Sequence, residues 1–347
     1  EKLMLALIKT SNGIGNIELQ EVDIPEISSS EVLIRVRACG ICGSDLKIFD
    51  DQHPFIPPVV IGHEFSGEIV EVGSEVVNWK VGDRVVSEQH VGACGHCRQC
   101  LTGNAFACKF KQAPGYFTDG AFTEFIKVPA WLLHRIPDTL SFEEAAFTEP
   151  SAVAVHGVLE RTGINPGDTV LVLGCGPIGI AAAKMAQITG ASDVIITGLE
   201  QDEKARLPKA REIGIDHVVN IQKIDLDKFV NELTNGKGVD VVIELAGALP
   251  AIQQAFNLVG PLGRLGIIGQ PPTDDVQIPY RQALFKALKV SFSYSSKFSS
   301  WEKALSMFER KSLKPTELIT HILPLKDWEE GFQLARSGEA VKVVLIP

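Results

Sequence analysis

The sequence predicts an α/β protein with two parts, a β-rich first part and a doubly wound parallel sheet that follows it. Up to about residue 150, short apolar runs such as 32–36, 67–73 and 83–86 alternate with Gly and Pro. That pattern is typical of a β-rich barrel with many turns. From about residue 166 the chain repeats the order strand, glycine turn, helix. Continuous β-branched runs separated by helices indicate a parallel sheet that is covered on both faces.

The second part shows its strands as short runs of Val, Ile and Leu. A helical stretch follows the first of these runs as far as Ile188, and a charged helical stretch over 203–213 follows the second. The strands that we predict from these runs are 169–173, 194–196, 239–244 and 264–268.

Three segments are expected to build the two domains. Residues 1–150 form the β-rich domain and residues 151–290 the parallel-sheet domain, while residues 291–347 return to complete the first. This tail carries two helical patterns, 301–310 and 327–336, and one apolar run, 341–346. We expect these three elements to add an extra layer to the first domain.

Composition excludes several classes of protein. A chain of 347 residues suggests about two domains, and a net charge of −10 argues against nucleic acid as the main partner. No apolar run approaches the roughly 18 residues of a membrane span. The apolar stretch within residues 1–9 is too short for a signal peptide and reads as a strand. Because four of the seven cysteines are clustered as in a metal site, we expect a reducing compartment, the cytoplasm.

The clustered cysteines are Cys94, Cys97, Cys100 and Cys108. Two residues separate Cys94 from Cys97 and Cys97 from Cys100, and seven lie between Cys100 and Cys108. These spacings let four thiolates surround one tetrahedral zinc ion. The alternatives are two disulfides, or thiols that pack as small apolar groups, but disulfide frameworks belong to small secreted chains. A zinc ion with four sulfur ligands has no open position, so it would hold a loop and do no chemistry.

A glycine-rich turn directly follows the strand predicted at 169–173 and opens a helix. It reads Gly174-Cys175-Gly176-Pro177-Ile178-Gly179, and this context is the one that a dinucleotide-binding turn requires. Gly174 permits the tight turn, Gly176 lets the pyrophosphate approach the backbone, and Gly179 lets helix and strand pack closely. The helix N-terminus supplies N–H donors for the phosphates. The alternative, a glycine turn that binds nothing, fits this context less well.

The end of the next strand discriminates less clearly between NAD and NADP. An acidic residue there would bind the ribose 2′-hydroxyl and indicate NAD, but this chain has Gly198 at that place. Gly198 leaves room for a 2′-phosphate that Lys204 and Arg206 could meet, whereas Glu200 and Asp202 would repel it. The sequence therefore favours NAD slightly, with Glu200 and Arg206 as candidate cofactor contacts.

A second, incomplete metal site is suggested by Cys42 and by His63, twenty-one residues further on. Spacing alone favours a structural role for a lone His with a lone Cys. The stretch 62–76, however, matches the pattern GHExxGxxxxxGxxV, and by it the chain resembles the zinc-containing medium-chain dehydrogenases. The four-cysteine loop, the stretch 80–85 and the glycine turn follow in the order of that family. The resemblance therefore covers essentially the whole chain.

The resemblance implies a GroES-like catalytic domain, a Rossmann domain, NAD or NADP, and two zinc ions per chain. The stretches 41–45 and 147–150 are similar to the polyol branch of the family, which includes sorbitol, threonine and galactitol-phosphate dehydrogenases. The zinc ligands that this branch implies are Cys42 and His63, with Glu64 or Glu149 in third place. A carboxylate in place of a second thiolate keeps the metal harder, which suits hydroxyl ligands.

The resemblance also implies the chemistry. Zinc lowers the pKa of bound water to about 7 and acts on a bound alcohol in the same way, and a hydride then passes to the nicotinamide. Ser44 is expected to accept the alcohol's proton, although its residue type is equally typical of a turn. Lys47 stands where relatives commonly have the His that ends the proton relay; it could steady an anionic substrate or point to solvent. Ser293 replaces a substrate-contacting Arg of sorbitol dehydrogenases, while Tyr294 keeps the aromatic hydroxyl beside it.

The sequence thus predicts a zinc oxidoreductase that converts a secondary alcohol of a polyol or sugar derivative to a ketone with NAD(P). One alternative is an amino-alcohol dehydrogenase of the threonine type. Another, from a different class, is a non-catalytic zinc module for protein or nucleic-acid contact, against which the acidic charge counts. The expected partner is a small-molecule alcohol or ketone, with no nucleic acid and no membrane. Since the family is usually dimeric or tetrameric, we expect a homodimer or a homotetramer.

Overall fold

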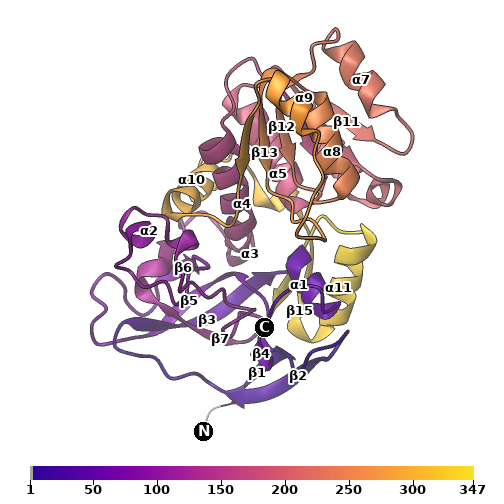
Figure 1. The fold of residues 1–347 in the computed structure, drawn as a ribbon. Helices are drawn as coiled ribbons and strands as arrows, with labels where there is room; N and C mark the ends of the chain where they lie inside the picture. Colours follow the sequence, from indigo (N-terminus) through magenta and orange to yellow (C-terminus); the bar gives the residue numbers. More distant parts are fainter. Residues whose placement is uncertain (1–2) are drawn as a thin grey trace. The chain divides into compact units, whose positions relative to one another are not determined.

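The computed structural model describes residues 3–347, which form two compact units (Figure 1). The first unit contains residues 3–149 and most of the tail, Lys297–Ser337 and Lys342–Pro347. The second unit contains Pro150–Ser296 and Gly338–Val341. The strand predicted at the N-terminus begins at Leu3, and residues 1 and 2 lie outside the described range.

The first unit is built on a seven-stranded sheet. Its strand pairs are antiparallel apart from the parallel pair β15–β16. Six strands follow one another in the order β15 (Ile319–Pro324), β16 (Lys342–Ile346), β3 (Glu31–Gly40), β5 (Glu64–Val72), β6 (Arg84–Ser87) and β8 (Leu133–Arg135), and β7 (Phe125–Pro129) pairs with β3.

One strand of the tail joins the sheet of the first unit. Strand β16 pairs with β3, Val344 opposite Gly40 and Leu345 opposite Cys39, so that the tail extends this sheet. The unpaired edge of β3 explains this outcome, because backbone N–H and C=O groups at a sheet edge need partners.

A second sheet of the first unit has three strands, in the order β2 (Ile17–Asp23), β1 (Leu3–Lys9) and β4 (Val59–Val60). The helices of this unit are short apart from the two in the tail. They are α1 (Gly43–Phe49), α2 (Arg98–Leu101), α3 (Phe142–Ala146), α10 (Phe298–Glu309) and α11 (Trp328–Ser337), and α4 (Thr148–Ala154) runs on from Glu149 into the second unit.

The second unit has a six-stranded sheet in the order β11-β10-β9-β12-β13-β14, and every neighbouring pair is parallel. This order reverses direction between β9 and β12, as in doubly wound dinucleotide-binding sheets. The predicted fold class is therefore confirmed. The strands are β9 (Thr169–Leu173), β10 (Asp193–Gly198), β11 (His217–Asn220), β12 (Val239–Glu244), β13 (Val259–Ile267) and β14 (Lys289–Phe292).

Helices α5 (Pro177–Thr189), α6 (Arg206–Glu212), α7 (Leu226–Leu233), α8 (Leu249–Leu258) and α9 (Tyr280–Phe285) accompany this sheet. The helix predicted over 203–213 is shorter than expected, since a 3₁₀ helix, η4 (Glu200–Lys204), precedes α6. Apolar side chains such as Leu171, Val242 and Phe256 form a buried core in this unit. Among the described residues, no helix is both long enough and apolar enough to span a membrane.

Candidate active site

The start of helix α1 and the start of strand β5 bring three candidate zinc ligands together. Cys42 is the N-cap residue of α1 and His63 directly precedes Glu64, the first residue of β5. One ligand atom from each of the three residues lies within 4.8 Å of the other two. Gly62 has a φ of +89°, and a Cβ there would lie 2.6 Å from the Phe122 ring. Only glycine therefore fits where the chain turns to present His63.

The carboxylate of Asp45 faces the imidazole of His63. The Asp45 Oδ1 atom lies 3.6 Å from His63 Nδ1, and both side chains are buried. Burial would lower the pKa of His63, but the Asp45 carboxylate and the neighbouring Cys42 raise this pKa well above its usual value. A carboxylate beside Nδ1 favours the tautomer with a proton on that atom, which leaves Nε2 as the metal-binding nitrogen. Sequence reasoning missed Asp45, although it lies three residues after Cys42.

Lys342 is the second residue that sequence reasoning missed. Its ammonium group forms a buried ion pair with the Glu64 carboxylate, and its Nζ donates to the Ile41 carbonyl at 2.8 Å. A Cβ at Gly40 would lie 2.4 Å from Glu64 Oε2 and 2.7 Å from Lys342 Cε, so the pair needs a glycine beside it. Lys342 lies almost three hundred residues from Glu64 in the sequence, and no local pattern could have indicated the contact.

Glu149 is buried close to these groups. Burial and the neighbouring Glu64 carboxylate raise the pKa of Glu149 to about 7, against the opposing effects of His63 and Lys342. It is not a member of the group of three ligand atoms that lie within 4.8 Å of one another. The geometry therefore favours Glu64 over Glu149 as the third protein ligand of a metal.

The residues present fit a zinc ion. Thiolate sulfur, imidazole nitrogen and carboxylate oxygen are the three donor types that zinc takes in proteins, and three protein ligands leave a fourth position for a substrate. In this site they would be Cys42, His63 and Glu64. The arrangement is thus able to polarise an alcohol or carbonyl oxygen as a Lewis acid does.

Two hydroxyl groups stand beside this donor set. The Ser44 Oγ atom lies 2.7 Å from the Tyr116 hydroxyl, which lies 3.3 Å from His63 Nε2. Burial and the nearby Cys42 and Asp45 raise the pKa of Tyr116 well above its usual value, so the phenol keeps its proton. Tyr116 is the third residue that the sequence did not indicate. Lys47 lies one turn further along α1 and is partly exposed.

The four clustered cysteines also converge. Sulfur–sulfur distances are 3.5 Å for Cys97–Cys100, 3.9 Å for Cys97–Cys108 and 3.8 Å for Cys94–Cys108. All seven cysteines are free thiols. The backbone N–H groups of Cys94 and Phe110 point at the Cys108 sulfur and lower the pKa of Cys108 to about 6. Four converging cysteine sulfurs with N–H donors beside them fit a closed, structural zinc site.

The glycine turn of the second unit has the geometry that a dinucleotide needs. Gly174 has a φ of +106°, and a Cβ at Gly179 would lie 2.0 Å from the Gly174 oxygen. Gly176 is the N-cap of α5 and has no atom within 4 Å of the place where its Cβ would stand. Pro177 and Ile178 begin the helix. The backbone is therefore open to a pyrophosphate at the helix N-terminus, where free N–H groups bind anions.

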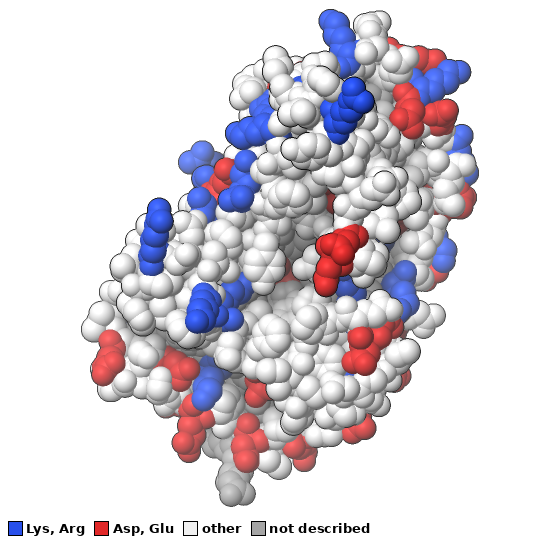
Figure 2. Space-filling model, viewed as in Figure 1, with Lys and Arg blue, Asp and Glu red and all other residues white. Residues whose placement is uncertain are grey.

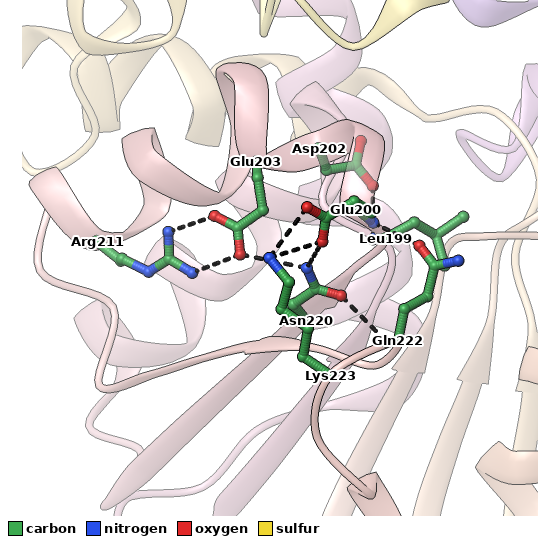
Figure 3. Close-up of polar contacts among 8 residues, drawn as sticks. All are labelled: Leu199, Glu200, Asp202, Glu203, Arg211, Asn220, Gln222 and Lys223. Carbon is green, nitrogen blue, oxygen red and sulfur yellow. Dashed lines mark hydrogen bonds and ion pairs between the residues drawn. The ribbon is translucent and has the colours of Figure 1, made fainter.

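Acidic and basic side chains neutralise one another at the carboxyl ends of β10 and β11 (Figure 3). Glu200 forms an ion pair with Lys223 at 2.7 Å and accepts from Asn220 Nδ2 at 2.8 Å. Glu203 forms two hydrogen bonds with the Arg211 guanidinium, at 2.8 and 3.0 Å. Lys223 and Arg211 are thus both paired with carboxylates.

Asp202 occupies the space next to Gly198. A Cβ at Gly198 would lie 3.1 Å from Asp202 Oδ2 and 2.5 Å from the Cys175 sulfur. Asp202 accepts a hydrogen bond from the Leu199 N–H at 2.8 Å and one from Arg206 at 3.0 Å. A carboxylate from η4 thus lies next to the end of β10, which has no acidic residue of its own. This carboxylate forms an ion pair with Arg206.

The structure places Tyr294, the candidate substrate contact, just after β14 in the second unit. Its side chain is 58% exposed. A role for Tyr294 in substrate binding stays a prediction.

Comparison with known proteins identifies the family. The family model described as alcohol dehydrogenase GroES-like domain matches residues 28–138, and the one described as zinc-binding dehydrogenase matches residues 177–310. A sorbitol dehydrogenase from Halalkalibacterium halodurans is 40% identical to this chain, with 99% of each chain covered. The chain belongs to the zinc-containing medium-chain dehydrogenases. The predicted family and its GroES-like and Rossmann domains are thereby confirmed.

Two further proteins are similar to this dehydrogenase over nearly its whole length. An L-threonine 3-dehydrogenase from Yersinia pseudotuberculosis is 36% identical, with 98% of each chain covered. A zinc-binding dehydrogenase from Sinorhizobium meliloti, solved bound to NADP, is 32% identical and covers each chain completely with a TM-score of 0.89. The protein is a zinc-dependent NAD(P) alcohol oxidoreductase, as predicted. The alternative of a non-catalytic zinc module is not favoured.

Proposed function

We propose that this dehydrogenase oxidises a secondary hydroxyl group of a polyol or sugar derivative to a ketone, with NAD as the preferred acceptor. The observation that carries the proposal is the composition of the site: one thiolate, one imidazole and two buried carboxyl groups, Cys42, His63, Glu64 and Glu149. A site in which oxygen donors outnumber sulfur donors suits hard, hydroxyl-bearing ligands. The full-length similarity to a sorbitol dehydrogenase supports the same substrate class.

In this proposal each residue has a separate task. Cys42, His63 and Glu64 would hold the zinc ion, which supplies Lewis acidity to the alcohol oxygen. Ser44 would accept the hydroxyl proton, while the hydride leaves carbon for the nicotinamide. Lys342 keeps the Glu64 carboxylate in place. Glu149 would place a second carboxyl group close to the zinc ion, and when ionised this group would lower the effective positive charge of the ion.

The preference for NAD rests on the acidic groups at the ribose end of the second unit. Asp202 stands beside Gly198, and Glu200 lies on the same 3₁₀ helix. A carboxylate there can pair with the ribose hydroxyls and repels a 2′-phosphate. The cations that could bind such a phosphate, Arg206, Arg211 and Lys223, all form ion pairs with carboxylates. Location in the cytoplasm and assembly as a homodimer or homotetramer remain part of the proposal.

The deciding experiment is a substrate screen on protein with a measured zinc content. Polyols, sugar phosphates and L-threonine would each be tested with NAD and with NADP. Two zinc ions per chain and turnover of polyols with NAD are expected. Turnover of L-threonine alone would instead favour the threonine-type alternative, which the Yersinia relative keeps open.

A further inference from the structure

Tyr116 puts a phenol next to the group that is expected to take the substrate's proton. Its hydroxyl oxygen lies 2.7 Å from Ser44 Oγ and 3.3 Å from His63 Nε2, and the residue is 8% exposed. The Ser44–Tyr116 bond joins residues 72 positions apart in the sequence. No described role in binding the metal or the cofactor uses this hydroxyl.

The loop around Tyr116 holds the phenol in place. The Ile56 N–H donates to the Tyr116 carbonyl at 2.9 Å, and the Gly115 N–H donates to the Thr118 carbonyl at 2.8 Å. The Tyr116 ring packs against the rings of His53 and His63, with centroid distances of 4.8 and 5.1 Å. A side chain fixed by backbone hydrogen bonds and by two ring contacts presents its hydroxyl in one direction, which is what a binding group requires.

The two hydroxyl groups together offer more hydrogen bonds than they use on each other. A serine and a tyrosine hydroxyl each combine one O–H donor with acceptor lone pairs. Their mutual bond consumes one donor and one acceptor, so a donor and several lone pairs are left. The separation of 2.7 Å is comparable to that of two oxygen atoms on adjacent carbons of a diol. A pair of neutral hydroxyl groups suits such a ligand better than it suits a charged amino group.

We propose that Tyr116 is a specificity-determining residue whose hydroxyl binds the second hydroxyl group of a vicinal diol substrate. Ser44 meets the hydroxyl that is oxidised, and Tyr116 meets its neighbour on the adjacent carbon. The inference rests on the proposed polyol function and assigns the recognition of the diol to one side chain. A monohydric alcohol has no second hydroxyl, so it gains nothing from Tyr116.

The test compares 2-butanol with 2,3-butanediol in the wild type and in Tyr116→Phe, with Tyr280→Phe as the matched control. Tyr280 is 70% exposed on α9, so its variant loses a tyrosine hydroxyl outside the site. In Tyr116→Phe we expect kcat/KM for the diol to fall about 10-fold, through an increase in KM, as the loss of one buried hydrogen bond of about 1.4 kcal/mol implies. In the same variant, the KM for 2-butanol and the zinc content should stay unchanged. In Tyr280→Phe, kcat/KM for the diol and the KM for 2-butanol should both stay unchanged.

A binding measurement without turnover completes the test. Calorimetric titration of 2,3-butanediol into the holoenzyme–NADH complex gives a Kd that should rise by the same factor in Tyr116→Phe. An equal loss of kcat/KM for both alcohols would show that Tyr116 acts by orienting Ser44 and would overturn the inference. An unchanged Kd for the diol in Tyr116→Phe would also overturn it. If the wild type oxidises no diol or polyol at all, the proposed function itself fails, which is a distinguishable outcome.

Discussion

The ammonium group of Lys342 and the carboxylate of Glu64 form an ion pair whose side chains are only 2% and 1% exposed. Lys342 comes from the last strand, β16, and Glu64 from the beginning of β5. Burial of two charges is costly, and removal of one partner typically costs about 3–5 kcal/mol, since the other charge is left uncompensated. The pair thus ties the C-terminal strand to a candidate zinc ligand.

Replacement of Lys342 should lower the stability of the metal-free protein and that of the zinc-bound protein to different extents. In Lys342→Met the metal-free protein should lose more thermal stability than the zinc-loaded one, because zinc can compensate the charge of Glu64. Calorimetric melting with and without zinc checks this, with Lys342→Arg as the variant that keeps the charge. Equal losses in the two forms would mean that Glu64 does not bind the metal.

Cys97 should matter for folding and little for chemistry. A structural zinc contributes folding free energy directly, so Cys97→Ala should lower the melting temperature and remove one of the two zinc ions. The buried Cys39 lies outside the cluster, and Cys39→Ala is the control that should keep both. An unchanged melting temperature in Cys97→Ala, with both ions retained, would contradict the zinc assignment.

Glu244 predicts a pH dependence of stability in the second unit. Its side chain is fully buried at the end of β12, Oε1 accepts from the Gly247 N–H at 2.8 Å, and burial raises the pKa of Glu244 above its usual 4.5. A raised folded-state pKa means that the folded protein binds the proton more tightly than the unfolded chain. Its contribution to stability is therefore complete below pH 4.5 and is lost as the pH rises through the folded-state pKa.

Glu244→Gln removes this titration while it keeps the shape and the acceptor for Gly247. The unfolding free energy of the variant minus that of the wild type should be greater at pH 8 than at pH 4. Denaturant unfolding of both proteins at the two pH values measures this difference. Glu232→Gln, at a side chain that is 67% exposed, is the control and should show no such difference. A constant difference between Glu244→Gln and wild type across this range would contradict the prediction.

The sequence predicted the parts of the site that are local and missed those that depend on the fold. The cysteine cluster and the glycine turn are each written within a short stretch, so their spacing determines their geometry. Tyr116 and Lys342 reach the site through loop conformation and strand pairing, at separations of 72 residues from Ser44 and 278 from Glu64. Periodicity carries no information on such contacts. Asp45 is the exception, because a carboxylate three residues after a candidate ligand could have been noticed.

The ribose end shows why a residue type alone can mislead. On residue type alone, an aspartate in place of Gly198 would favour NAD, because an acidic residue at that strand end binds the ribose 2′-hydroxyl. The structure places the Cys175 sulfur 2.5 Å from the Cβ that this variant would add. We therefore expect Gly198→Asp to destabilise the second unit, since Cys175 and Leu207 leave no room for the added side chain and Asp202 would repel its charge.

Asp202→Asn should make the dehydrogenase more tolerant of NADP. The change removes the carboxylate that would repel a 2′-phosphate and releases Arg206 from its 3.0 Å ion pair. We expect the Kd for NADP, measured by quenching of protein fluorescence, to fall about 10-fold, which corresponds to about 1.4 kcal/mol. The Kd for NAD should rise. If only Glu200→Gln changes the ratio of the two constants, Glu200 is the discriminating residue.

Glu149 is the residue on which the two possible ligand sets differ. Glu149→Gln removes a negative charge near the metal but keeps the shape, so zinc should become more electrophilic and less firmly held. Loss of a weak ligand or of a group that supports a ligand typically costs about 10–100-fold in metal affinity or activity. Glu149→Cys should restore tight zinc binding but should not restore the rate of polyol oxidation, because a thiolate ligand makes the metal softer. Zinc content measured beside turnover in both variants decides the matter. Full turnover in Glu149→Gln with two zinc ions retained would leave Glu64 as the third ligand and Glu149 without a part in the reaction.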